Sequence, residues 1–170
     1  GTDKDGNKVT IGWAGPLADE VEAMLKDEQK VKDILTEAGY ILNGDETVAV
    51  LGAQNICLKN LDYNKIDVPE GGVDLTIPLQ ARYYDYTNKV WIENEEVANL
   101  KDGDRLYILH QKADGTWEVL EGTAVVKVDE SGNKTYAVAG HFDSLSPVAV
   151  IKVMSNGEVV VLENNKKVGT

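Results

Sequence analysis

Short apolar runs separated by turn signals follow one another through the second half of the chain, and this pattern constrains the fold more than any other feature. The clearest turn signal is Asn156-Gly157, the dipeptide most typical of a two-residue hairpin. Consecutive antiparallel strands produce such an alternation. The pattern predicts hairpins that pair residues 105–111 with 116–120, 123–128 with 134–139, and 147–154 with 158–162.

Strand-like patterning also extends back toward residue 46. Between residues 73 and 79, apolar and other side chains alternate, as expected of a strand with one buried face. Pro78 interrupts that run, which favours a strand at the edge of a sheet. A further hairpin is predicted around Thr87-Asn88. Because no strand is followed by a crossover helix, the fold is predicted to be mainly β, an antiparallel β-sandwich of the Ig-like or ZU5-like kind.

One helical segment is predicted over residues 16–38, where apolar residues recur at a spacing of three and four. Pro16 suits the first position of a helix, and Gly39 suits the position just past its end. The apolar stripe breaks at Glu28, and Asp27 is a suitable N-cap, so two short helices are an alternative. We expect this segment to pack on the sheet.

The length of 170 residues predicts one domain, or one domain with a small appendage. We divide the chain into an N-terminal turn and helical segment (1–45), a β-sandwich domain (46–163) and a frayed polar tail (164–170). Since Gly1 is not a natural start residue, the chain is expected to be a part of a longer protein.

The formal net charge of -12 argues against two classes of partner. An acidic surface repels nucleic-acid phosphates and anionic lipids. No apolar run approaches the roughly 20 residues that a membrane-spanning helix requires. We therefore expect neither nucleic-acid binding nor membrane insertion within this chain.

The residues for familiar catalytic and metal sites are sparse. His110 and His141 are the only histidines, and no metal-ligand pair such as His-x-x-x-His occurs. The set His141, Asp143, Ser144 and Ser146 contains the residue types of a hydrolase triad. Residues so close along an extended strand diverge to opposite faces, however, so they are not expected to converge on one substrate. The sequence predicts no catalytic residue, no metal and no cofactor.

Aromatic residues are concentrated between positions 83 and 91. Tyr84 and Tyr86 share one face of a strand and Tyr83 takes the other. Exposed aromatic rings stack on sugar rings in many carbohydrate-binding sandwiches, whereas buried ones only fill a core. Tyr84, Tyr86 and Trp91 are therefore the candidate ligand contacts, and packing in the core is the competing interpretation.

Three segments together carry a resemblance to a known kind of module. They are Gly-Asp-Arg-Leu-Tyr-Ile-Leu-His at 103–110, Gly-Thr-Trp-Glu-Val at 115–119 and Phe-Asp-Ser-Leu-Ser-Pro-Val-Ala-Val at 142–150. This set resembles a β-sandwich module of Gram-positive cell-surface and secreted proteins that ends in a Ser-Leu-Ser-Pro-Val-Ala strand. The resemblance implies an extracellular or cell-wall-associated protein of the Firmicutes type, with no established enzyme activity.

A weaker likeness is to ZU5-type sandwich domains, some of which cleave themselves at a His-Phe-Ser sequence. Here His141-Phe142 is followed by Asp143, and Ser144 comes one position late, so self-cleavage is not expected.

The function predicted first is a non-catalytic, structural or adhesive module of a bacterial surface or secreted protein. The alternative is a carbohydrate-binding module that uses the hairpin from Tyr83 to Trp91. A third hypothesis is an autoproteolytic or hydrolytic enzyme built around His141. Cell-wall glycans, host glycans and proteins all remain as candidate partners.

Overall fold

The structure is a computed structural model and describes residues 1–3, 5–145, 147–155, 158–163 and 166–169. Strands dominate this part of the chain, and every pairing between named strands is antiparallel. The elements are β1 (Thr2–Asp3), β2 (Thr10–Trp13), α1 (Asp19–Leu25), α2 (Glu28–Glu37), β3 (Glu46–Gln54), β4 (Ile56–Lys59), β5 (Lys65–Ile66), β6 (Val73–Leu79), β7 (Arg82–Asp85), β8 (Val90–Glu93), α3 (Glu95–Ala98), β9 (Arg105–Gln111), β10 (Trp117–Val128), β11 (Lys134–Phe142), β12 (Val148–Ser155), β13 (Glu158–Val159), β14 (Val161–Glu163) and β15 (Lys166–Gly169).

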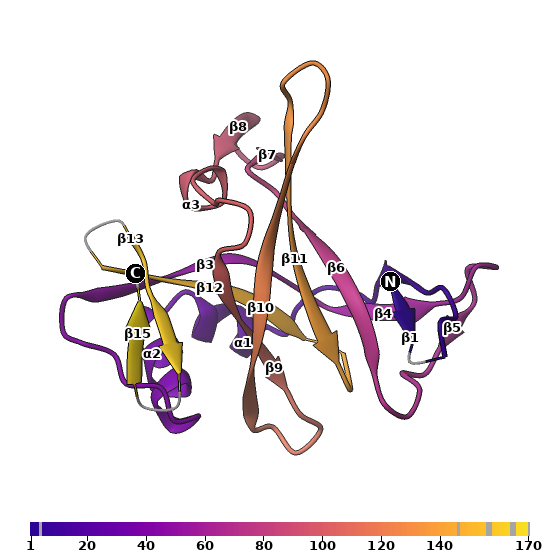
Figure 1. The fold of residues 1–170 in the computed structure, drawn as a ribbon, viewed down its shortest axis with the longest axis horizontal. Helices are drawn as coiled ribbons and strands as arrows, with labels where there is room; N and C mark the ends of the chain where they lie inside the picture. Colours follow the sequence, from indigo (N-terminus) through magenta and orange to yellow (C-terminus); the bar gives the residue numbers. More distant parts are fainter. Residues whose placement is uncertain (4, 146, 156–157, 164–165, 170) are drawn as a thin grey trace.

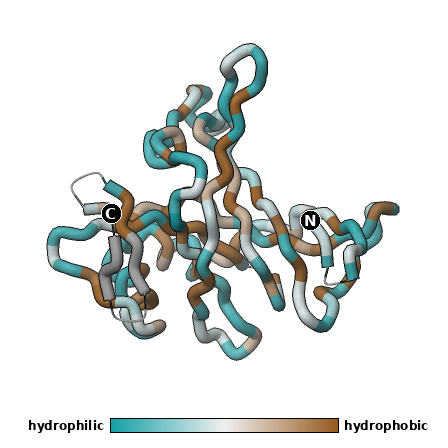
Figure 2. Tube along the Cα trace, in the orientation of Figure 1, coloured by the Kyte–Doolittle hydropathy of each residue, from teal (hydrophilic) through white to brown (hydrophobic). Residues whose placement is uncertain are grey.

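The main sheet has eight strands, in the order β1-β6-β11-β10-β9-β12-β13, and β3 also pairs with β12. Residues 148–151 of β12 pair with both β9 and β3, so these two strands lie on opposite edges of β12. The sheet twists strongly, and β10 and β11 run steeply across β3 and β12 (Figure 1). Hydrophobic residues follow the middle of the long strands, whereas the turn of the β10–β11 hairpin is mainly hydrophilic (Figure 2).

A second sheet, in the order β2-β4-β5, closes over one face of the main sheet. Ile56 and Leu58 from this small sheet belong to the same buried cluster as Leu75, Ile77 and Ile108 from the large one. Strand β3 leads directly into β4, so one stretch of chain passes from the first sheet to the second. The prediction of a mainly β, antiparallel sandwich is therefore confirmed.

The two long helices cover the other face of the main sheet. Val31 and Leu35 of α2 are fully buried, in a cluster with Tyr107, Leu109 and Ile151. Alternate residues of β9 therefore pack into the two buried clusters on opposite faces of the main sheet, because successive side chains of a strand point to opposite faces. The expected packing of the N-terminal helical segment on the sheet is confirmed.

The helical segment takes the two-helix form that the sequence left open. The Asp27 carboxylate accepts hydrogen bonds from the main-chain N–H groups of Gln29 and Lys30, which is the N-cap that separates α2 from α1. The prediction that Pro16 opens the first helix is wrong, since α1 begins at Asp19. Gly39 follows the end of α2 with a φ of 101°, as predicted for a residue just past a helix.

Replacing Asp27 with alanine should lower the free energy of unfolding by about 1 kcal/mol, because two main-chain N–H groups lose their acceptor. Asp27→Asn keeps an acceptor oxygen at the same place and should leave stability close to that of the wild type. Urea unfolding followed by far-ultraviolet circular dichroism measures both variants. Equal losses for alanine and asparagine would rule out this capping role.

Strand β10 differs from the prediction. The runs 116–120 and 123–128, predicted as separate strands, form one continuous strand of 12 residues. Gly122 lies in its middle, where a Cβ atom would lie 2.7 Å from Val138 Cγ2 and 2.9 Å from Ile108 Cδ1. The glycine therefore permits close approach of the neighbouring strands and does not mark a break.

The ends of the chain also carry more strand than predicted. In the predicted N-terminal segment (1–45), β1 pairs with β6 and β2 pairs with β4, so this segment contributes strands to both sheets as well as the helices α1 and α2. Within the predicted tail (164–170), Lys166–Gly169 form β15, which pairs with β14, whereas residues 164, 165 and 170 lie outside the described residues. The predicted turn Asn156-Gly157 lies outside the described residues, although β12 and β13 pair on either side of it.

Candidate functional site

The predicted aromatic hairpin exists. Strands β7 and β8 pair in a register that sets Tyr84 opposite Trp91. The ring of Tyr84 contacts both Tyr86, with ring centroids 4.8 Å apart, and Trp91, with centroids 5.4 Å apart. The two tyrosines therefore lie on the same side of the hairpin, although β7 ends at Asp85 and Tyr86 belongs to the turn that follows. Tyr86 is 83% exposed and Trp91 is 57% exposed, so this cluster faces solvent.

The cluster does not form a flat platform. Tyr84 meets Tyr86 at an interplanar angle of 72° and Trp91 at 74°. The guanidinium of Arg82 lies 4.6 Å from the centre of the Trp91 ring, in a cation–π contact. These rings pack edge to face on one another, which stabilises a two-stranded ribbon that is marginal by itself.

One carboxylate, that of Asp85, stabilises the turn of this hairpin. Asp85 accepts hydrogen bonds from the main-chain N–H groups of Thr87 and Asn88 and from the side-chain amide of Asn88. The hydrogen bond from the Asn88 side chain is the main cause that lowers the pKa of Asp85 below its ordinary value. The predicted turn at Thr87-Asn88 is confirmed.

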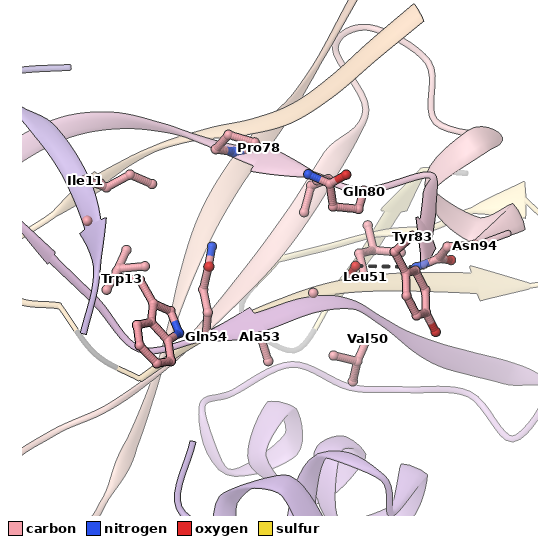
Figure 3. Close-up of a pocket in the computed structure, with 14 residues that line it drawn as sticks. Ile11, Trp13, Val50, Leu51, Ala53, Gln54, Pro78, Gln80, Tyr83 and Asn94 are labelled. Atoms are coloured by element: carbon pink, nitrogen blue, oxygen red, sulfur yellow. Dashed lines mark hydrogen bonds between the residues drawn. The ribbon is translucent and has the colours of Figure 1, made fainter. Parts of the chain in front are cut away.

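A cavity of about 620 Å³ lies beside the hairpin. Its wall comes from 11–13 in β2, 50–54 in β3, 78–80 at the end of β6, and from Ile56, Tyr83 and Asn94 (Figure 3). Its volume is in the range of small-ligand pockets. The outer edges of β3 and β6 both border it, and at these residues neither edge pairs with another described strand.

Two exposed rings stand at opposite ends of the cavity, with Gln54 between them (Figure 3). Trp13 is 71% exposed and Tyr83 is 46% exposed. Asn94 is already engaged, since its side-chain amide donates to the Leu51 carbonyl and its carbonyl oxygen accepts from Val97 N. The sequence prediction missed this site because its wall comes from separate segments, and only Tyr83 of the wall lies in the aromatic stretch that the sequence singled out.

His110 is at the centre of a buried polar contact. Its side chain is 2% exposed, with Nδ1 2.9 Å from Glu118 Oε1 and Nε2 3.4 Å from Ser144 Oγ. The ring nitrogens of a buried imidazole need partners, and these two side chains supply them. Ser144 lies in the loop that precedes β12, which begins at Val148. Ser146 lies outside the described residues.

His141 belongs to a different cluster. Its Nδ1 lies 2.7 Å from Asp74 Oδ1 and its Nε2 lies 3.6 Å from Asp143 Oδ1. The hydrogen bond with Asp74 is the main cause that raises the pKa of His141 above its ordinary value. His141 and Ser144 thus contact different partners, as predicted, but the reason differs, since Ser144 lies in the loop after β11.

The raised pKa of His141 predicts how one contribution to stability depends on pH. The pKa of His141 is higher in the folded state than in the unfolded state, where it is about 6.5. The contact between His141 and Asp74 therefore contributes fully to stability below the unfolded pKa, and this contribution is lost as pH rises through the folded pKa. The stability difference between the wild type and Asp74→Asn should therefore shrink as pH rises from 5 to 9. Urea unfolding at several pH values measures it, and a difference that grows with pH would contradict this assignment.

No group of three or more His, Cys, Asp or Glu side chains in the described part of the chain is placed to hold a metal ion. None of its helices combines the length and apolar character needed to cross a membrane.

Comparison with known proteins finds no match for this chain among protein-family models, curated proteins or solved structures.

Proposed function

We propose that this chain is a non-catalytic, adhesive module of a bacterial surface or secreted protein, and that it adheres by binding carbohydrate. One observation carries the proposal. Trp13, Tyr83, Tyr86 and Trp91 are exposed aromatic side chains, and all four lie on the β7–β8 hairpin or at the cavity beside it. Aromatic rings supply large, rigid contact areas for the apolar faces of ligand rings. The extracellular location rests on the resemblance of residues 103–150 to Gram-positive surface modules.

Affinity electrophoresis tests this proposal with the intact chain. The protein migrates through native gels that contain a soluble β-glucan, galactomannan, xylan, polygalacturonate or hyaluronan, with a non-binding protein as the reference. We expect at least one polysaccharide to retard the protein relative to the reference. Unchanged mobility in every gel would overturn carbohydrate binding and leave the purely structural module.

A second candidate is a serine hydrolase, and one observation favours it. Ser144, His110 and Glu118 follow one another through contacts of 3.4 Å and 2.9 Å, in the order of a nucleophile, base and acid. It ranks second because the first contact is long for a hydrogen bond from a hydroxyl and because Ser144 does not border the cavity described above. Labelling by a fluorophosphonate that is lost in Ser144→Ala would replace the non-catalytic proposal, and no labelling is expected.

A further inference from the structure

We propose that the cavity between the outer edges of β3 and β6 is the carbohydrate site, and that it takes an uncharged sugar chain. In this arrangement Trp13 and Tyr83 stack on sugar rings, and the carboxamides of Gln54 and Gln80 bind sugar hydroxyl groups. This inference rests on the proposed function and names the site and the ligand class that the function leaves open.

The charge of the cavity wall selects the ligand class. Charged residues make up 27% of the chain, yet none of the 14 residues drawn around the cavity is charged. An anionic group placed there would lose water without gaining a cationic partner, and the net charge of -12 would repel it as well. Uronic acids and sialic acids are therefore disfavoured, and neutral sugars fit.

The two rings are available for stacking. Neither Trp13 nor Tyr83 enters an aromatic pair with another described residue, whereas Tyr84 and Trp91 are engaged in such pairs. Trp13 and Tyr83 also stand at opposite ends of the opening, so an elongated ligand can reach both (Figure 3). A sugar can thus stack on each ring without separating a ring pair that the fold uses.

The polar groups of the wall match sugar hydroxyls. The side-chain amides of Gln54 and Gln80 have no hydrogen-bond partner among the described residues, and both residues border the cavity. A carboxamide offers a carbonyl acceptor and an NH₂ donor on one side chain. A hydroxyl group also both donates and accepts, so one carboxamide can bind adjacent hydroxyls of a sugar ring.

An extended peptide fits this cavity less well, although two strand edges border it. Pro78 has no main-chain N–H to donate to an added strand. On the β3 side, the Leu51 carbonyl already accepts a hydrogen bond from Asn94. The backbone groups that strand addition would use are therefore reduced on both edges.

Titration calorimetry tests the site with the neutral polysaccharide, β-glucan, galactomannan or xylan, that retards the wild type most. We expect Trp13→Ala and Tyr83→Ala each to weaken binding by about tenfold, which is the loss of one aromatic contact. Trp13→Phe and Tyr83→Phe keep a ring and should bind within about threefold of the wild type. Tyr86→Ala and Trp91→Ala test the neighbouring ring cluster as the competing site, and we expect them to lose less affinity than the Trp13 and Tyr83 variants do. The matched control is Tyr63→Ala, which removes a ring that is 76% exposed and does not border the cavity; it should bind as the wild type does. Urea unfolding of each variant shows that it is folded.

The outcomes separate this inference from the proposed function. Losses confined to the Trp13 and Tyr83 variants support the cavity. Losses confined to the Tyr86 and Trp91 variants would overturn the cavity while leaving carbohydrate binding in place. Binding of polygalacturonate or hyaluronan alone would overturn the neutral ligand class. Failure of the wild type to bind any of these polysaccharides would remove the proposed function and this inference together.

Discussion

Replacing Gly72 with alanine should lower the free energy of unfolding by about 3 kcal/mol, the largest loss we expect of any single change considered. Gly72 has a φ of 77°, in the left-handed region that disfavours a side chain. A Cβ atom there would lie 2.6 Å from His141 Nε2, from Asp143 Oδ1 and from the main-chain oxygen of Phe142. Since the Phe142 oxygen is backbone in β11, the neighbouring strand would have to move.

Gly115→Ala is the matched control for this change. Gly115 has a φ of 88°, and a Cβ atom there would meet nothing within 4 Å. This variant should therefore show the conformational cost alone, about 1 kcal/mol. Urea unfolding of the two variants measures the difference. Equal losses of stability in Gly72→Ala and Gly115→Ala would contradict the close packing of Gly72 against the end of β11.

Replacing Glu96 with alanine should lower the free energy of unfolding by about 2 kcal/mol, because it leaves a buried charge without its ionic partner. Lys152 on β12 has a side chain that is only 2% exposed. Its ammonium donates to the Glu96 main-chain oxygen at 3.0 Å and lies 3.5 Å from the Glu96 carboxylate. This contact joins α3 to β12 of the main sheet. Loss of the ion pair should therefore also destabilise the segment that leads from β8 to β9.

Lys152→Met provides the contrast that identifies the cause. Methionine keeps an unbranched apolar stem and removes the charge together with its desolvation cost, so stability should change by less than about 1 kcal/mol. Glu96 is 40% exposed, and water can solvate its carboxylate when the ammonium is gone. A large loss in Lys152→Met with little loss in Glu96→Ala would show that packing of the lysine stem, and not its charge, holds α3.

The local elements could be predicted from the sequence because their signals are local. Alternation of apolar residues predicted β6 and the hairpins around residues 87, 114 and 131, and the capping side chain of Asp27 marked the start of α2. The pairing of β3 with β12 joins residues about a hundred positions apart, and no pattern within either strand specifies its neighbour. The same limit hid the partner of Lys152, which the sequence shows only as one charge in an apolar run.

The candidate site was predicted in part for the same reason. Periodicity placed Tyr84 and Tyr86 on one face of a strand. The structure brings their rings together but places Tyr86 in the turn after β7, and periodicity does not specify the angle between two rings. The cavity was missed because β2, β3 and the end of β6 meet only through the sandwich topology. The extracellular location and the kinship with Gram-positive surface modules stay predictions from residues 103–150.

Nuclear magnetic resonance of the three indole N–H groups tests the central claim most directly. The three tryptophans report on different places: Trp13 on the cavity, Trp91 on the hairpin cluster, and Trp117 on the core beneath α2. On addition of short oligosaccharides cut from the neutral polysaccharide that binds, we expect the Trp13 signal to shift and the Trp117 signal to stay. A shift of Trp91 without Trp13, or no shift of any indole at saturating sugar, would contradict a neutral sugar site at this cavity.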